Sequence, residues 1–276
     1  MPKPAVIVVN SHVVRGSVGG RSAVFALERM GFPVWSLPTV SLAWHPGHGR
    51  STRTVPDDAA FAATVGDLAA TPMLAGVAGV LIGYLGSAGQ VAPLAGLVKA
   101  LKAANPLARF LYDPDIGDNG ILFVPEATAS AARDGLLPLA DITTPNRFEL
   151  GWLARGAPET QAEIVAAARR LGPAEVVVTS AEQTATTIKT VLVSDDGVVT
   201  AAQPAIAAAP KGTGDLFAAL YLGHRLSRRS PEEAMRRGAS SVARLVARAA
   251  ASDTDELPLA EGADDLAGDG SDVAIS

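Results

Sequence analysis

The most chemically informative residues run from Pro210 to Leu220 and read Pro-Lys-Gly-Thr-Gly-Asp-Leu-Phe-Ala-Ala-Leu. Gly212 and Gly214 have no Cβ, so the backbone can take unusual dihedrals and a ligand can come close. The apolar residues after Asp215 recur at helical spacing, so the turn leads directly into a helix. The first N–H groups of a helix have no partner within it, and the helix dipole favours negative charge there. The turn is therefore a predicted phosphate seat.

Asp215 is an unusual residue for such a turn, because its carboxylate would repel a bound phosphate. One task that accounts for it is the removal of a proton from a hydroxyl that attacks the phosphate, which makes Asp215 a candidate general base. The alternative is structural: Thr213 or Asp215 caps the helix, and the glycines only make the turn. The motif by itself favours neither interpretation.

A second group of acids follows the strand-like residues 109–112. Asp113 stands before Pro114, and Asp115 and Asp118 follow in a glycine-rich loop. A calcium loop counted from Asp113 fails, because Asp118 stands where that loop needs glycine and Val124 where it needs glutamate. Mg²⁺ bound through water and substrate phosphates is the better hypothesis for these carboxylates, with a plain turn as the alternative.

Two more residues follow strand-like segments and could touch a ligand. Ser11 comes after the apolar run 5–9, and Tyr84 comes after the run 79–82. Ligands of open parallel sheets collect beyond the carboxyl ends of the strands, so Ser11 could contact one and the Tyr84 ring could stack on a flat one. A turn-forming hydroxyl and a packed core ring are the alternatives.

Two histidines, His45 and His48, lie in an irregular segment. Pro46 and Gly47 separate them, and no carboxylate or third histidine is close in sequence, so the spacing argues against a metal site. A mobile loop over a pocket fits the segment better.

The elements that must position these residues alternate along the chain. Strand-like runs precede helical stretches repeatedly, and Thr187–Ser194 and Val198–Ala202 read as a hairpin around Asp195-Asp196-Gly197. This alternation predicts one doubly wound α/β domain over residues 1–251, with a mostly parallel central sheet flanked by helices and an antiparallel edge.

Composition limits the remaining possibilities. The 276 residues are 48% apolar and contain no cysteine, which excludes disulfides and thiolate chemistry. No apolar run reaches membrane-spanning length and the start does not resemble a signal peptide, so a cytoplasmic location is expected.

Charge divides the chain into a body and a tail. The net charge is −5, but residues 252–276 carry eight acids and no lysine or arginine, which leaves 20 acids against 23 bases, near +3, in the rest. A weakly positive body suits small anionic ligands and shows no basic stripe for nucleic acid. The tail is acidic and poorly periodic, so it is expected to be disordered.

Taken together and in order, five motifs resemble pyridoxal kinases of the ribokinase-like superfamily, over about residues 5–250. They are Ser11-His-Val-Val14 with Gly16 and Gly20, Gly83-Tyr-Leu-Gly86, Asp113-Pro114 with Gly117, Pro145-Asn146 with Phe148-Glu149-Leu150, and Gly212-Thr-Gly-Asp215. The last motif alone indicates only the superfamily; the first two indicate the pyridoxal branch.

The resemblance implies a homodimeric enzyme that transfers the γ-phosphoryl group of ATP, with Mg²⁺, to the 5′-hydroxymethyl of pyridoxal. The implied substrate residues are Ser11, Tyr84, His48 and Asp215; the nucleotide residues Asp113, Thr144, Glu149 and Lys211; the Mg²⁺ residues Asp113, Asp118 and Glu149; the anion hole Gly212, Thr213 and Gly214; and the base Asp215.

The chain also departs from the family pattern. Trp44-His-Pro-Gly-His-Gly49 stands where members typically have Asn-His-Thr-Gln-Tyr-Gly, so Pro46-Gly47 replaces a polar pair and His48 takes the tyrosine position. Asp115-Ile116 replaces Val-Met, and Lys211 replaces a small apolar residue. Two alternatives therefore stay open: a hydroxymethylpyrimidine-type kinase, and a vitamin B6-binding protein with little turnover.

Overall fold

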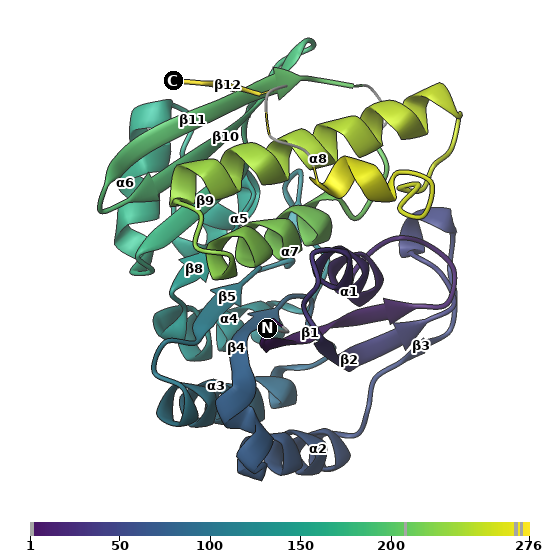
Figure 1. Ribbon diagram of the computed structural model, residues 1–276, viewed down its shortest axis with the longest axis vertical. Coiled ribbons are helices and arrows are strands. Elements are labelled where there is room, and N and C mark those ends of the chain that lie inside the picture. The colour runs from purple at the N-terminus through teal and green to yellow at the C-terminus, as the bar shows by residue number, and fades with distance from the viewer. Residues whose placement is uncertain (1–2, 207–208, 268–269, 271–272) are drawn as a thin grey trace.

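The computed structural model describes residues 3–206, 209–267, 270 and 273–276. Its centre is a ten-stranded sheet in the order β12-β11-β10-β9-β8-β5-β4-β1-β2-β3 (Figure 1). The strands from β9 to β2 in this order are parallel, whereas β3 at one end and β10, β11 and β12 at the other pair antiparallel. The predicted fold class is confirmed, and the predicted hairpin is present as β10 and β11.

The strands and helices have the following bounds. The strands are β1 Ala5–Val13, β2 Val34–Leu42, β3 Arg53–Thr54, β4 Val77–Ile82, β5 Arg109–Tyr112, β6 Gly117–Asp118, β7 Ile121–Leu122, β8 Ile142–Thr143, β9 Glu175–Gln183, β10 Thr187–Ser194, β11 Gly197–Pro204 and β12 Ala274–Ile275. The helices are α1 Gly20–Arg29, α2 Asp58–Ala70, α3 Val91–Ala104, α4 Glu126–Gly135, α5 Arg147–Leu153, α6 Gln161–Leu171, α7 Thr213–Leu226 and α8 Pro231–Ala251.

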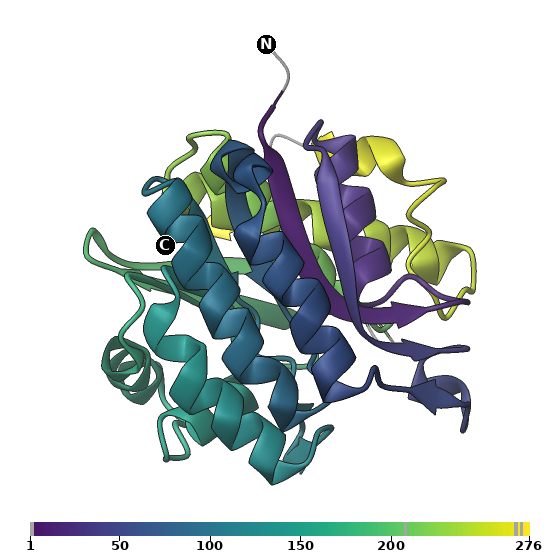
Figure 2. The same ribbon diagram turned by 90° about the horizontal axis from the view of Figure 1, so that it is seen from below.

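The sheet is buried on both faces, which explains its β-branched strands. Along β1, Ile7 and Val9 join the core under α2 to α6, whereas Val6 and Val8 join the core under α1, α7 and α8. Figure 2 shows these two helical layers on opposite sides of the sheet. Because successive strand side chains point to opposite faces, a continuous apolar run is what a strand between two helical layers requires.

The strand order reverses at β1, which pairs with β2 on one side and β4 on the other. Ligands of doubly wound sheets bind in the crevice at such a switch point, beyond the carboxyl ends of the strands. The turns after β1, β4, β5 and β8 therefore meet at this edge of the sheet.

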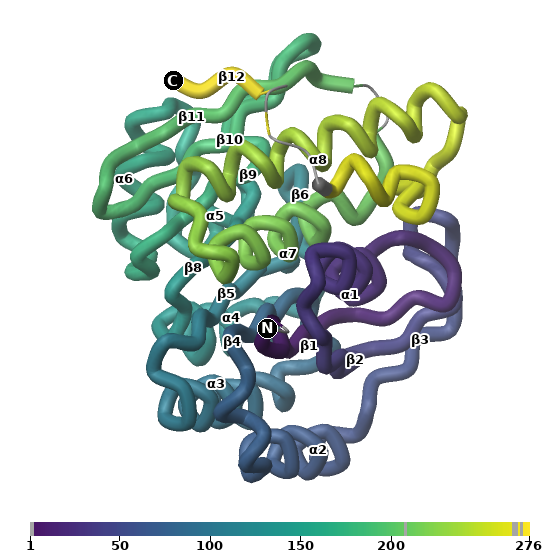
Figure 3. Tube along the Cα trace, viewed as in Figure 1, coloured from purple at the N-terminus to yellow at the C-terminus, as the bar shows by residue number. Residues whose placement is uncertain are grey.

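The acidic tail differs from the expected disorder. Leu257, Leu259 and Leu266 are buried in the core shared with α1, α7 and α8, and β12 pairs with β11. The path of the chain after α8 is traced in Figure 3. Three leucines spaced through an acidic segment supply enough apolar surface to pack it, although they follow no regular period. Residues 268, 269, 271 and 272 of the tail lie outside the described part.

None of the helices in the described residues combines the length and the apolar character needed to cross a bilayer.

Candidate active site

The glycine turn precedes helix α7 as predicted. Gly212 is the N-cap residue with φ of 90°, a left-handed conformation that favours glycine. A Cβ at Gly212 would lie 2.4 Å from the carbonyl oxygen of Ser17, so the turn packs tightly against the segment before α1. A Cβ at Gly214 would meet no atom of the described residues within 4 Å, which leaves room beside the first turn of the helix for a ligand.

Asp215 lies in the first turn of α7 with 9% of its surface exposed. Its Oδ2 accepts a hydrogen bond from the Gly19 N–H and its Oδ1 one from Asn10 Nδ2, both at 2.9 Å. Burial raises the pKa of Asp215, and these hydrogen bonds oppose the rise. Gly212 is the N-cap residue of the helix, and the Asp215 carboxylate is held across the crevice by residues about 200 positions away in sequence.

Asn10 is a site residue that the sequence analysis did not identify. Its Oδ1 accepts the N–H of Ser11 at 2.6 Å and the N–H of Tyr84 at 3.2 Å, while its Nδ2 donates to Asp215. It therefore ties the later part of β1 and the turn after β4 to the first turn of α7. Its position directly after the apolar run 5–9 was the signal that could have found it.

Gly19 is a second missed residue, since only its backbone reaches Asp215. Its φ is 60°, and a Cβ there would lie 2.2 Å from the Ser11 hydroxyl oxygen. A side chain at this position is therefore sterically excluded.

The acids after β5 meet the same crevice. Buried Asp113 accepts a hydrogen bond from the Thr144 hydroxyl at 2.8 Å, and Asp115 has a φ of 42°. Burial and then the charges of Asp215 and Glu149 raise the pKa of Asp113 well above its usual range. Burial and the neighbouring carboxylates act on Asp115 in the same direction. A cation bound here would relieve this repulsion, and carboxylate oxygens are the ligands that a hard divalent ion prefers.

Glu149 and Asp118 are engaged differently from Asp113. The Glu149 carboxylate accepts N–H groups of Ile116 at 2.8 Å, Gly117 at 3.3 Å and Asn146 at 2.9 Å. It forms a capping box with Asn146, and burial raises its pKa to about 7 against these hydrogen bonds. The Asp118 carboxylate accepts hydrogen bonds from the backbone N–H and from the side-chain Nδ2 of Asn119. Glu149 therefore shapes the acidic loop. Asp115 is absent from the predicted metal set, and among the neighbouring charges that of Asp215 raises the Asp115 pKa most.

A cavity of about 790 Å³ joins these parts. The predicted residues that line it are Ser11, Tyr84, Asp113, Asp118, Thr144, Glu149, Lys211, Gly212, Thr213, Gly214 and Asp215. A volume in this range suits a small-molecule site.

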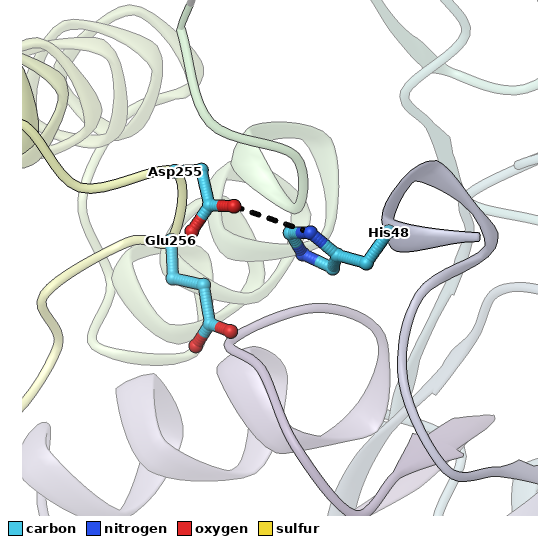
Figure 4. A group of neighbouring side chains, drawn as sticks. All are labelled: His48, Asp255 and Glu256. Carbon is cyan, nitrogen blue, oxygen red and sulfur yellow. Dashed lines mark ion pairs between the residues drawn. The ribbon is translucent and has the colours of Figure 1, made fainter.

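His48 differs from its predicted place in the substrate site. It is not among the described residues that line the cavity, and its Nδ1 lies 3.2 Å from Asp255 Oδ2 in the tail (Figure 4). His45, Pro46 and Gly47 line the cavity instead. His45 Nδ1 accepts the Gly47 N–H, and burial followed by the charge of Lys211 lowers the pKa of His45.

Comparisons with known proteins agree with this geometry. Residues 67–260 match the family model described as phosphomethylpyrimidine kinase. A pyridoxal kinase of Deinococcus radiodurans is 36% identical, over 87% of this chain and 85% of its own length. One of Leifsonia xyli is 34% identical over 98% of both chains.

The chain belongs to the pyridoxal kinase family. A solved structure of the family, the pyridoxal kinase from Leishmania donovani in complex with ADP and pyridoxamine, superimposes with a TM-score of 0.91 at 28% identity and covers 99% of both chains. The predicted resemblance is therefore confirmed, and so is its ribokinase-like fold.

Proposed function

We propose that the protein is an ATP-dependent pyridoxal kinase that phosphorylates the 5′-hydroxymethyl group of pyridoxal. The observation that carries the proposal is the placement of Asp215: a fixed, buried carboxylate beside an open glycine turn, in one cavity with Ser11 and Tyr84. Family members similar to this chain are pyridoxal kinases by name, which supports the same substrate.

In the proposed reaction Asp215 accepts the proton of the substrate hydroxyl while its oxygen forms the new bond to the γ-phosphorus of ATP. The bond between that phosphorus and the bridging oxygen breaks, and ADP leaves with the electron pair. The N–H groups of Gly212, Thr213 and Gly214 at the start of α7 stabilise negative charge on the transferred group. Because Asn10 and Gly19 fix the carboxylate before substrate arrives, no reorganisation is needed during the reaction.

Ser11 and Tyr84 are assigned to the pyridine ring, and Lys211 and Thr144 to the nucleotide. The Asn10 side chain accepts the backbone N–H groups of Ser11 and Tyr84 and donates to Asp215. The residues assigned to the ring and the assigned base are therefore held by the same side chain. Lys211 adds positive charge at the entry to the glycine turn, where phosphates would lie.

Asp113 and Asp115 would hold Mg²⁺, directly or through water, with Asp118 and Glu149 nearby. A bound Mg²⁺ would supply positive charge that offsets the negative charge of the phosphates. The buried carboxylates repel one another in its absence, which is the physical reason to assign the ion to them.

A coupled assay for ADP production tests the proposal. Pyridoxal with ATP and Mg²⁺ should support turnover, and hydroxymethylpyrimidine should support much less. Calorimetric binding of pyridoxal without turnover would instead favour the binding-protein alternative, and preference for hydroxymethylpyrimidine would favour the other kinase.

Homodimer formation and a cytoplasmic location stay predictions from the sequence. Light scattering after size-exclusion chromatography tests the first, and fractionation of the source cells tests the second.

A further inference from the structure

The acidic segment after α8 meets two turns that border the cavity. Asp255 Oδ2 lies 3.2 Å from His48 Nδ1, and Glu256 Oε1 lies 3.1 Å from Arg15 Nε. Arg15 also lies 3.9 Å from Asp255 Oδ1. Figure 4 shows Asp255 pointing toward His48, with the Glu256 side chain next to it. The tail thus contacts the turn after β2 and the turn after β1 at the same place.

The tail segment is anchored on the body of the protein. Leu257 directly follows the two acids and is only 1% exposed, in the core beside α1 and α7. The backbone of Arg15 is also held, because its backbone N–H donates to the Ala43 carbonyl at 2.9 Å. The acids therefore project from a packed position, and the ion pairs need little further ordering of the backbone.

The turn held by the tail is itself a compact unit. The His48 N–H donates to the His45 carbonyl at 2.9 Å, the Gly47 N–H to His45 Nδ1 at 2.9 Å, and Trp44 Nε1 to the Gly49 carbonyl at 3.2 Å. His45, Pro46 and Gly47 face the cavity, while His48 faces the tail. A displacement of His48 would therefore also move the residues of the turn that line the cavity.

A metal ion is the other occupant to weigh, since His48, Asp255 and Glu256 each offer a ligand atom within 4.8 Å of the others. Arg15 lies beside both acids and offsets one of their two negative charges, and its own positive charge opposes a bound cation at this place. The contacts favour ion pairing.

We infer that the acidic tail positions the turn Pro46–His48, which borders the cavity. Asp255 and His48 are the positioning pair, and the contact of Arg15 with Glu256 supports them. The inference rests on the proposed function for its kinetic readout. Pro46 and Gly47 stand where family members typically have the polar Thr-Gln pair. This turn therefore acts on the substrate mainly through where it places His45, Pro46 and Gly47 along the cavity wall. The tail would set the KM for pyridoxal and leave the chemical step to Asp215.

The test combines hydrogen exchange with kinetics on the full chain. In His48→Gln and in Asp255→Asn, exchange of the Gly47, His48 and Gly49 amides should accelerate. The KM for pyridoxal should rise about twofold to fivefold, the range expected from losing one exposed pair. The kcat and the KM for ATP should stay within about twofold in both variants.

The two changes should not add, because they remove the same contact. His48→Lys places a permanent cation opposite Asp255 and should retain a KM close to the native one. Combined with Asp255→Asn, the same lysine should not retain it. The matched control is Asp264→Asn, which removes the same charge from the tail at a pair with Arg29 on α1, away from the turn. It should change neither exchange nor KM.

Unchanged amide exchange in both single variants would show that the contact between Asp255 and His48 does not hold the turn in place. Faster exchange with an unchanged pyridoxal dissociation constant, measured by calorimetry, would overturn its role in positioning. If the native chain bound pyridoxal without phosphorylating it, the proposed function would fail, while exchange and the dissociation constant would still decide the positioning role.

Discussion

Replacing Asp215 by asparagine tests the base and the helix-cap interpretations directly. The carboxylate accepts one hydrogen bond on each oxygen, from Asn10 Nδ2 and from the Gly19 N–H. A carboxamide has one oxygen, so its NH₂ group must face one of these two donors. Losing that hydrogen bond costs about 1–3 kcal/mol of stability, and removing a buried charge offsets part of it.

The effect on catalysis should be larger than the effect on stability. A residue that cannot accept a proton forfeits general-base catalysis, typically a factor of about 10²–10⁴ in kcat, or roughly 3–5 kcal/mol of barrier. The affinity for pyridoxal should change much less, because Ser11 and Tyr84 stay in place. ATP affinity should rise slightly, because a negative charge beside the glycine turn has gone.

The assay is steady-state kinetics by ADP release, with melting temperature and pyridoxal calorimetry on the same samples. Asn10→Ala is a comparison variant that keeps the carboxylate and removes one of its two hydrogen bonds, together with the acceptor of the Ser11 and Tyr84 N–H groups. Its kcat should fall by less than about tenfold, as positioning alone is impaired. In the native protein, kcat/KM should rise with pH on the acid limb, through a pKa above that of an ordinary aspartate. An Asp215→Asn protein with near-native kcat would refute the base assignment.

Three further predictions concern the acids and the tail. Asp113→Ala should raise the Mg²⁺ and ATP concentrations needed for half-maximal rate at least several-fold and leave pyridoxal affinity unchanged; identical titration curves would remove Asp113 from the site. The pKa of Glu149 is raised from 4.5 to about 7, so the folded protein binds this proton more tightly than the unfolded chain does. The free energy of unfolding should then fall as pH rises from about 4.5 to about 7. Glu149→Gln should flatten that slope in urea titrations, and an unchanged slope would contradict the assignment. Ending the chain at Ser252 removes three buried leucines, so the melting temperature should fall by about 2–4 °C for each kcal/mol lost, and a native value would show that the tail contributes nothing.

Residue types and their spacing predicted the fold class, and most of the site residues predicted from the sequence line the cavity. Short apolar β-branched runs between helical stretches are typical of strands buried on both faces, and glycines before an apolar helical face mark the start of a helix. These are local properties of the chain, which is why Asp215, Asp113 and the hairpin turn at Gly197 could be placed from residue types and spacing.

Long-range contacts decided the rest. Asn10 and Gly19 hold Asp215 across 205 and 196 residues, and no local pattern encodes such a contact. The His48 side chain pairs with Asp255, far away in a segment whose charge alone suggested disorder. An amino-acid pattern reports what a segment can form with its neighbours in sequence. Which partner a side chain meets depends on the packing of the whole chain, and here that packing places His48 beside Asp255 of the tail.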